Sequence, residues 1–133
     1  MGRLTRDRRD EPQAWRHGAG QGEATMRGRV GLLYPELEAY VDGVVREVGQ
    51  IPAGRRETLA RLADFVAGRA AAGQPARITF ICSHNSRRSQ LAQVWAWAAA
   101  AHHGVAGVET YSGGTEASAL DPRAVAALVR AGF

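Results

Sequence analysis

The chain has 133 residues, of which 45% are hydrophobic and 23% are charged, as in an ordinary globular domain. Its single cysteine excludes an internal disulfide framework, and no apolar run approaches the length of a membrane span. The cysteine usage and the absence of a signal-peptide pattern in the first thirty residues predict a cytoplasmic protein with no membrane partner.

The net charge of +4 is unevenly placed along the chain. The first 29 residues hold seven arginines against four acidic residues, whereas the remainder is close to neutral. Nucleic-acid binding needs a clustered basic face, whereas this charge lies mostly in a polar tail. We therefore expect no nucleic-acid partner.

Residues 1–28 are rich in glycine and charged residues and show no hydrophobic periodicity. This composition predicts a disordered basic tail. Met26 is a hypothetical alternative to Met1 as the natural start, which the intact mass of the native protein would decide.

Residues 29–72 predict a helical hairpin. Pro52 and two glycines interrupt the apolar pattern within residues 49–54. The hairpin would either pack on its own domain, which we favour, or form the surface of a homodimer. Apolar residues recur at helical spacing on both sides of the interruption, namely Leu33, Leu37, Tyr40, Val41, Val44 and Val48 before it and Leu59, Leu62, Phe65 and Val66 after it.

Residues 73–133 predict a strand–helix–strand–helix unit. The β-branched and aromatic run of residues 76–82 is typical of a buried strand, and an amphipathic helix starts around Arg88 or Ser89. Residues 108–112 form the second predicted strand, closed by two glycines. The last helix has Asp121 as N-cap, Pro122 as its first residue and Gly132 as its C-terminal cap.

This order predicts an α/β fold, a three-layer αβα sandwich around a parallel sheet. Two parallel strands make a poor sheet, because parallel sheets are normally larger and covered on both faces. We therefore expect the sequence to be truncated after the second strand–helix unit.

The only cysteine, Cys82, lies at the carboxyl end of the first predicted strand, where open α/β sheets bind ligands. The following helix points its N-terminus at the same loop, and its free N–H groups favour an anion. The same field and the nearby Arg88 would lower the pKa of the thiol. Such a thiolate can attack a bound phosphate and form a cysteinyl-phosphate. The alternative is an inert, buried thiol.

The sequence CSHNSRRS, residues 82–89, resembles the Cys-x5-Arg-Ser loop of the low-molecular-weight protein tyrosine phosphatases and the related arsenate reductases. Those families commonly show Cys-x-Gly-Asn-x-x-Arg-Ser. YSGGTEA is similar to their Ser-Ala-Gly-Thr segment, and DPRAVAALVRAGF is similar to the helix that follows it. The resemblance covers residues 77–133.

The resemblance implies roles for the loop residues. Cys82 would be the nucleophile, Arg88 would bind phosphate and stabilise the transition state, and Ser89 would hydrogen-bond the thiolate. Asn85 would hold the loop in its strained shape. The sequence departs from the family at two positions, because His84 replaces a common glycine and Arg87 replaces a common second cysteine. The phosphate-binding set, whose N–H groups would contact the oxyanion, is Ser83, His84, Asn85, Ser86, Arg87 and Arg88.

In the same family an aspartate, usually followed by proline, protonates the leaving group from a loop far toward the C-terminus. The only Asp-Pro here is Asp121-Pro122. Asp121 is either that acid or a helix N-cap, and its position favours the N-cap. The resemblance then places the acid beyond Phe133.

We therefore predict a cysteine-dependent phosphatase with no cofactor and no metal. Its substrate would be a phosphorylated protein, a small phosphoester or another oxyanion. One alternative is an arsenate reductase that uses an external thiol, because the chain has no second cysteine. Another is a catalytically incomplete oxyanion-binding fragment.

Overall fold

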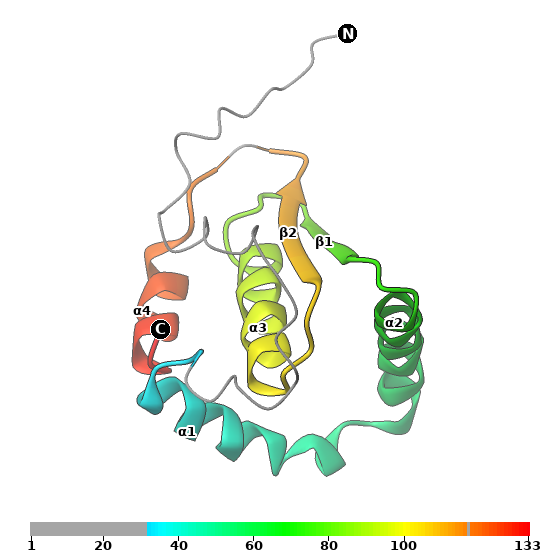
Figure 1. Ribbon diagram of the computed structural model, residues 1–133. Helices are drawn as coiled ribbons and strands as arrows, with labels where there is room; N and C mark the ends of the chain where they lie inside the picture. The colour runs from blue at the N-terminus through cyan, green and yellow to red at the C-terminus, as the bar shows by residue number, and fades with distance from the viewer. Residues whose placement is uncertain (1–31, 117) are drawn as a thin grey trace, which may run out of the picture.

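The computed structural model describes residues 32–116 and 118–133, and the tail predicted over residues 1–28 lies outside them. The described chain forms four α-helices, one 3-10 helix and two strands. Figure 1 shows α3 at the centre, with α1 crossing below it, α4 on one side and α2 on the other. In chain order the elements are α1 (Pro35–Val45), a 3-10 helix (Val48–Gln50), α2 (Ala53–Ala71), β1 (Ala76–Cys82), α3 (Arg88–His102), β2 (Val108–Gly114) and α4 (Pro122–Arg130).

The two strands form a parallel sheet, as predicted. Ala76 pairs with Val108 and Cys82 pairs with Gly114. The first strand has the predicted bounds, whereas β2 runs two residues past the predicted end at Ser112 because both glycines continue the ladder. The α/β class is confirmed, and within the described residues the sheet is only partly formed.

Helix α3 covers one face of this sheet. Along β1 the side chains alternate, with Ile78, Phe80 and Cys82 half-buried and the residues between them exposed. Ile81 is 75% exposed, and Tyr111 on β2 is 47% exposed. The first strand is therefore not buried as predicted, because only one of its faces is covered in the described part of the chain.

The hydrophobic core lies between α1, α3 and the C-terminus. Pro35 at the first position of α1 and acidic residues in its first turn favour this helix start. The Trp95 ring stacks on Tyr40 at 5.5 Å and packs nearly perpendicular to Phe133 at 5.0 Å, measured between ring centroids. The buried residues of this cluster are Leu33, Leu37, Val41 and Ala98.

The two helices predicted over residues 29–72 are present, and they lie against different elements. Helix α1 contacts α3, whereas α2 contacts β1, with the Arg69 guanidinium donating to the Pro75 carbonyl at 3.0 Å. The apolar pattern predicted the helices correctly, but it did not predict what they pack against. Several other apolar side chains of this predicted pattern are exposed, with Val44 at 47%, Val48 in the 3-10 helix at 49%, Leu59 at 46%, Leu62 at 36% and Phe65 at 46%, whereas Val66 is half-buried.

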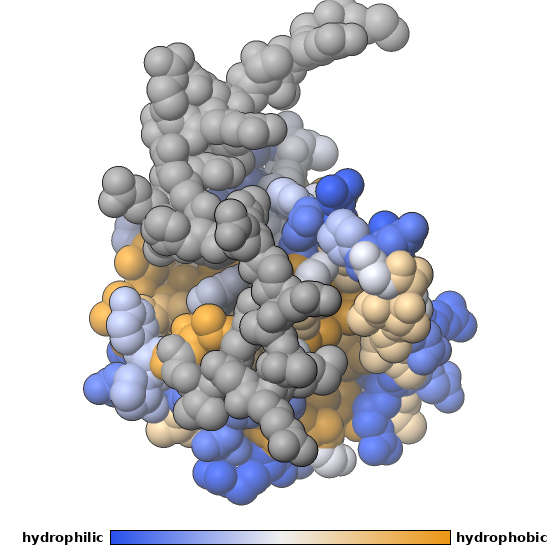
Figure 2. All heavy atoms as spheres, in the orientation of Figure 1, coloured by the Kyte–Doolittle hydropathy of each residue, from blue (hydrophilic) through white to orange (hydrophobic). Residues whose placement is uncertain are grey.

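Apolar areas therefore reach the surface, and Figure 2 shows them among charged and polar side chains. None of the helices in the described ranges has the length and apolar character that crossing a membrane requires.

Candidate active site

The site is built around Cys82, the last residue of β1. Residues 83–87 form a loop, and α3 begins at Arg88. The Cys82 sulfur lies 3.0 Å from the hydroxyl oxygen of Ser89, which is in the first turn of α3 and is 2% exposed. The Ser89 hydroxyl also donates to Asn85 Oδ1 at 2.9 Å. Strand end, loop and helix start are thus joined by one short chain of hydrogen bonds.

The loop turns sharply at Asn85, whose φ is +47°. Asparagine adopts this left-handed conformation more readily than most residues, which fits the role that the resemblance implies. The Gln90 side-chain amide donates to the Asn85 carbonyl. The side chain and the carbonyl group of Asn85 are therefore both held by residues in the first turn of α3.

These contacts change the acidity of the thiol. The Ser89 hydroxyl, followed by the Ser89 N–H group, lowers the pKa of Cys82 from 9.0 to about 7, against an opposing effect of desolvation. The N–H groups of Asn85 and His84 make smaller contributions to the same lowering of the pKa. Cys82 is therefore substantially a thiolate at neutral pH, the form that acts as a nucleophile.

The carbonyl groups of the loop are bound from outside by the chain that follows β2. The N–H groups of Thr115 and Glu116 donate to the Ser83 carbonyl at 2.9 and 3.1 Å. The Ser118 hydroxyl donates to the His84 carbonyl, and the Asp121 N–H group donates to the Ser86 carbonyl at 2.8 Å. We call residues 115, 116, 118 and 121 the outer segment. With its carbonyls held there, the loop has N–H groups left to face an anion.

Gly114 permits the close approach of the loop to β2. A Cβ atom at this position would lie 2.7 Å from both the Asn85 nitrogen and the Cys82 carbonyl oxygen, too close for any side chain. The sequence predicted Gly114 as a strand end within the family-like YSGGTEA segment, and Asp121 as an N-cap. The contacts of the outer segment and of Gln90 with the loop were not predicted, because nothing in their spacing connects them with the cysteine.

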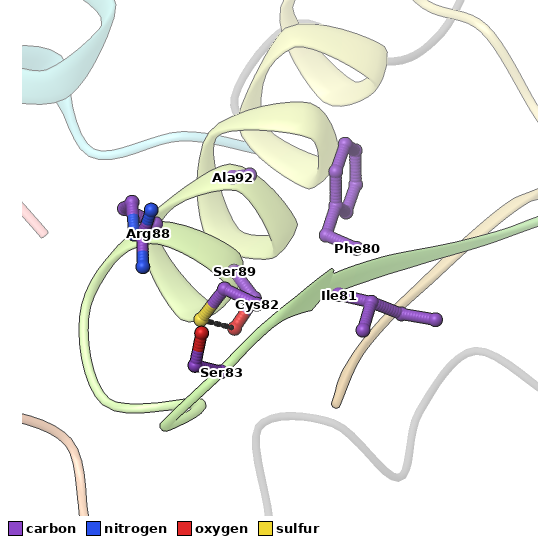
Figure 3. A pocket seen from close by; sticks show the side chains of 7 residues that line it. All are labelled: Phe80, Ile81, Cys82, Ser83, Arg88, Ser89 and Ala92. Carbon is purple, nitrogen blue, oxygen red and sulfur yellow. Dashed lines mark hydrogen bonds between the residues drawn. The ribbon is translucent and has the colours of Figure 1, made fainter. Parts of the chain in front are cut away.

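The loop borders a small open pocket of about 330 Å³. Cys82, Ser83, Arg88 and Ser89 form its polar end, and Figure 3 shows the sulfur and the Ser89 hydroxyl linked there. The remaining wall is apolar and consists of Phe80, Ile81 and Ala92. The structure thus brings together three residues predicted to be catalytic, Cys82, Arg88 and Ser89, and their catalytic roles stay predictions.

The side chains at the two departures from the family loop each lie close to a carboxylate. His84 Nε2 lies 3.4 Å from a carboxylate oxygen of Glu116, and both side chains are 61% exposed. Arg87 Nε lies 3.6 Å from Asp121 Oδ2. The Arg87 side chain is 57% exposed beside this carboxylate.

Asp121 is the N-cap of α4. Its Oδ1 accepts from the Arg123 N–H group at 2.9 Å. Hydrogen bonds from the Arg123 side chain and from that N–H group lower the pKa of Asp121 to about 2. A carboxyl group that stays ionised above pH 2 has no proton to give to a leaving group at neutral pH, so the geometry supports the N-cap interpretation.

Within residues 32–116 and 118–133, no group of three or more histidine, cysteine or acidic side chains is arranged to hold a metal ion. The chemistry available here is that of a thiolate, a guanidinium and backbone N–H groups.

Comparison with known proteins agrees with this chemistry. Residues 77–133 match the family model described as low molecular weight phosphotyrosine protein phosphatase. No curated protein and no solved structure gave a significant match. The matched segment begins one residue into β1, and it contains the rest of β1, the cysteine loop, α3, β2 and α4. As the loop resemblance predicted, the match over residues 77–133 is to the low molecular weight phosphotyrosine protein phosphatases, and it is consistent with a partial member of that family.

Proposed function

We propose that the chain is a cysteine-dependent phosphatase that hydrolyses phosphoric monoesters through a cysteinyl-phosphate. The observation that carries this proposal is the short contact between Cys82 and Ser89, in a loop that lowers the pKa of the thiol to about 7. The family match supports the same class of substrate, a phosphorylated protein or a small phosphoester.

In the first step the Cys82 thiolate attacks phosphorus. A sulfur–phosphorus bond forms while the ester oxygen–phosphorus bond breaks, and the departing oxygen takes a proton from water or from an acid. The loop N–H groups and the Arg88 guanidinium would bind the non-bridging oxygens, where negative charge must be stabilised. In many enzymes, preorganised donors of this kind make the largest single contribution to stabilising the transition state.

In the second step water attacks the phosphorus of the cysteinyl-phosphate. The sulfur leaves as a thiolate and inorganic phosphate is released, which restores the starting enzyme. Ser89 favours this departure, because its hydroxyl can donate a hydrogen bond to the sulfur across 3.0 Å. The same contact would therefore assist both halves of the reaction.

Leaving groups that need no acid are the natural first substrates to test. Asp121 is held ionised by Arg123, so the proposal assigns it no proton transfer. An aryl phosphate such as p-nitrophenyl phosphate releases a stable phenolate and has little need of a general acid. It therefore tests the nucleophile and the loop by themselves.

The test compares hydrolysis of p-nitrophenyl phosphate by the full chain and by a Cys82→Ser variant of equal folded content. We expect turnover by the former and loss of at least about a thousandfold in the variant, because a serine hydroxyl is a far weaker nucleophile. Rapid acid quench should trap the intermediate, and mass spectrometry should then detect one phosphoryl group on Cys82. A folded wild-type chain that neither turns over nor is phosphorylated would refute the proposal.

Arsenate reduction is the second candidate, and the cysteine count favours one form of it. Arsenate matches phosphate in charge and shape, and Cys82 is the only cysteine of the chain, so two electrons must come from external thiols. Arsenite formation with glutathione, without p-nitrophenyl phosphate hydrolysis, would identify this activity. Phosphate or arsenate binding without either reaction would identify an oxyanion-binding module.

A further inference from the structure

At its helix end the loop of residues 83–87 contacts Asp121, the N-cap of α4. We propose that Asp121 is a positioning residue, which orients Ser86 and Arg87 so that the loop N–H groups face the Cys82 thiolate. The inference deepens the proposed function, on which it rests for the identity of Cys82 as the reactive group.

The first contact is through the main chain. The Asp121 N–H group donates to the Ser86 carbonyl at 2.8 Å. This bond directs the carbonyl of the peptide between Ser86 and Arg87 outward, and because a peptide is planar and trans, its N–H group points the opposite way. The Asp121 contact therefore sets the direction of one loop donor.

The second contact is through the side chain. The Asp121 carboxylate is only 16% exposed, and its Oδ2 lies 3.6 Å from Arg87 Nε and 2.9 Å from Arg123 Nη2. Its Oδ1 accepts from the Arg123 main chain at 2.9 Å and from Arg123 Nε at 3.1 Å. One ionised group thus links the loop with the first turn of α4.

The C-terminal end of α4 and the residues after it pack in the hydrophobic core, so the position of α4 is fixed. Leu128 and Ala131 are buried, and the Phe133 and Trp95 rings pack nearly perpendicular to each other. At Gly132 the chain approaches α1 so closely that a Cβ atom would lie 2.5 Å from the Leu37 nitrogen. Asp121 therefore connects the loop with a packed helix, which a free loop residue could not do.

Three possible roles of Asp121 predict different changes in the pKa of Cys82. If the Asp121 carboxylate positions the loop through Arg87, its replacement lets the Arg87 end of the loop shift even though the main-chain bond to Ser86 remains, and the pKa of the thiol rises. If it acts only by its negative charge, removal lowers that pKa, because Arg87 is left unbalanced. If it serves only as a helix cap, removal lowers stability and leaves the pKa unchanged.

The experiment measures the rate of Cys82 alkylation by iodoacetamide as a function of pH. Because the chain has one cysteine, the reaction reports on this thiol alone. The variants are Asp121→Ala and Asp121→Asn, since asparagine remains a good N-cap and keeps the protein folded if alanine does not. Arg123→Ala is the matched control, because it removes the partner on α4 and leaves the Arg87 pair in place.

We expect the pKa of Cys82 to rise by about half a unit or more in both Asp121 variants and to stay near 7 in the control. Added inorganic phosphate should also protect the thiol from alkylation less well in these variants. An unchanged or lowered pKa in a folded Asp121→Asn protein would overturn the inference. Since alkylation needs no turnover, this result is independent of whether the chain hydrolyses phosphoesters.

Discussion

The Cys82 sulfur and the Ser89 hydroxyl lie 3.0 Å apart, and the same hydroxyl donates to Asn85. One hydroxyl hydrogen cannot serve two acceptors fully at once. When the thiol is protonated, its S–H group can donate to Ser89 while Ser89 donates to Asn85. When the thiol ionises, the hydroxyl can turn toward the sulfur, so this pair follows the charge of the nucleophile.

Replacing Ser89 should therefore raise the pKa of Cys82. The Ser89 hydroxyl is the largest cause of its lowered value of about 7, so in Ser89→Ala we expect a shift of about one unit toward the ordinary 9.0. The pH dependence of alkylation measures this directly, and hydrolysis at neutral pH should fall with it. Thr79→Ala, which removes a hydroxyl from the exposed face of β1, serves as control. Equal pKa values in Ser89→Ala and the wild type would contradict the prediction.

The same thiol makes folding stability depend on pH. Its folded pKa of about 7 lies below its ordinary 9.0, so the folded state favours the thiolate. The stability gained in this way is fully present above pH 9 and is lost as the pH falls through 7. In urea unfolding, the free energy of unfolding of the wild type should therefore rise relative to that of Cys82→Ser between pH 7 and pH 9. A stability difference that is flat over this range would show that the loop does not favour the thiolate.

Gly114 and Gly113 form a matched pair for testing the close approach of the loop to β2. A Cβ at Gly114 would lie 2.7 Å from the backbone of Asn85 and Cys82, whereas one at Gly113 would meet nothing within 4 Å. We expect Gly114→Ala to cost about 2 kcal/mol of unfolding free energy and to raise the pKa of the thiol. Gly113→Ala should change both far less. Thermal unfolding and alkylation together measure the two effects, and similar results for the pair would argue against the described packing.

Leucines on α1 and α2 should differ sharply in their contribution to stability. Leu37 on α1 is 2% exposed and packs in the core, whereas Leu59 on α2 is 46% exposed. We expect Leu37→Ala to cost about 3 kcal/mol and Leu59→Ala less than about 1 kcal/mol. Chemical denaturation of both variants checks this. A large loss for Leu59→Ala would mean that α2 buries its apolar face in solution.

The features that the sequence predicted correctly are the ones that depend on neighbours in the chain. Strand β1, the start of α3 and the Asp121 cap are all signalled within a few residues, and each was found where expected. The loop motif is equally local, which is why a single cysteine with an arginine six residues later was informative.

The features that were not predicted depend on contacts between distant segments. Spacing showed that Leu59 and Leu62 share a helical face, but nothing in α2 itself says whether that face meets α1, the sheet or solvent. Likewise, the bond from Ser118 to the His84 carbonyl joins residues 34 positions apart. Such a bond follows from the parallel pairing of β1 and β2, which brings both strand ends to one edge.

The carbonyls of the loop at Ser83, His84, Asn85 and Ser86 all accept hydrogen bonds within the described chain. Their dipoles are therefore already oriented when an anion arrives. An entering oxyanion needs to displace only water, because the peptide planes need not rotate. We expect the enthalpy and the association rate of anion binding to resemble those of a rigid receptor, because the loop needs little reorganisation energy.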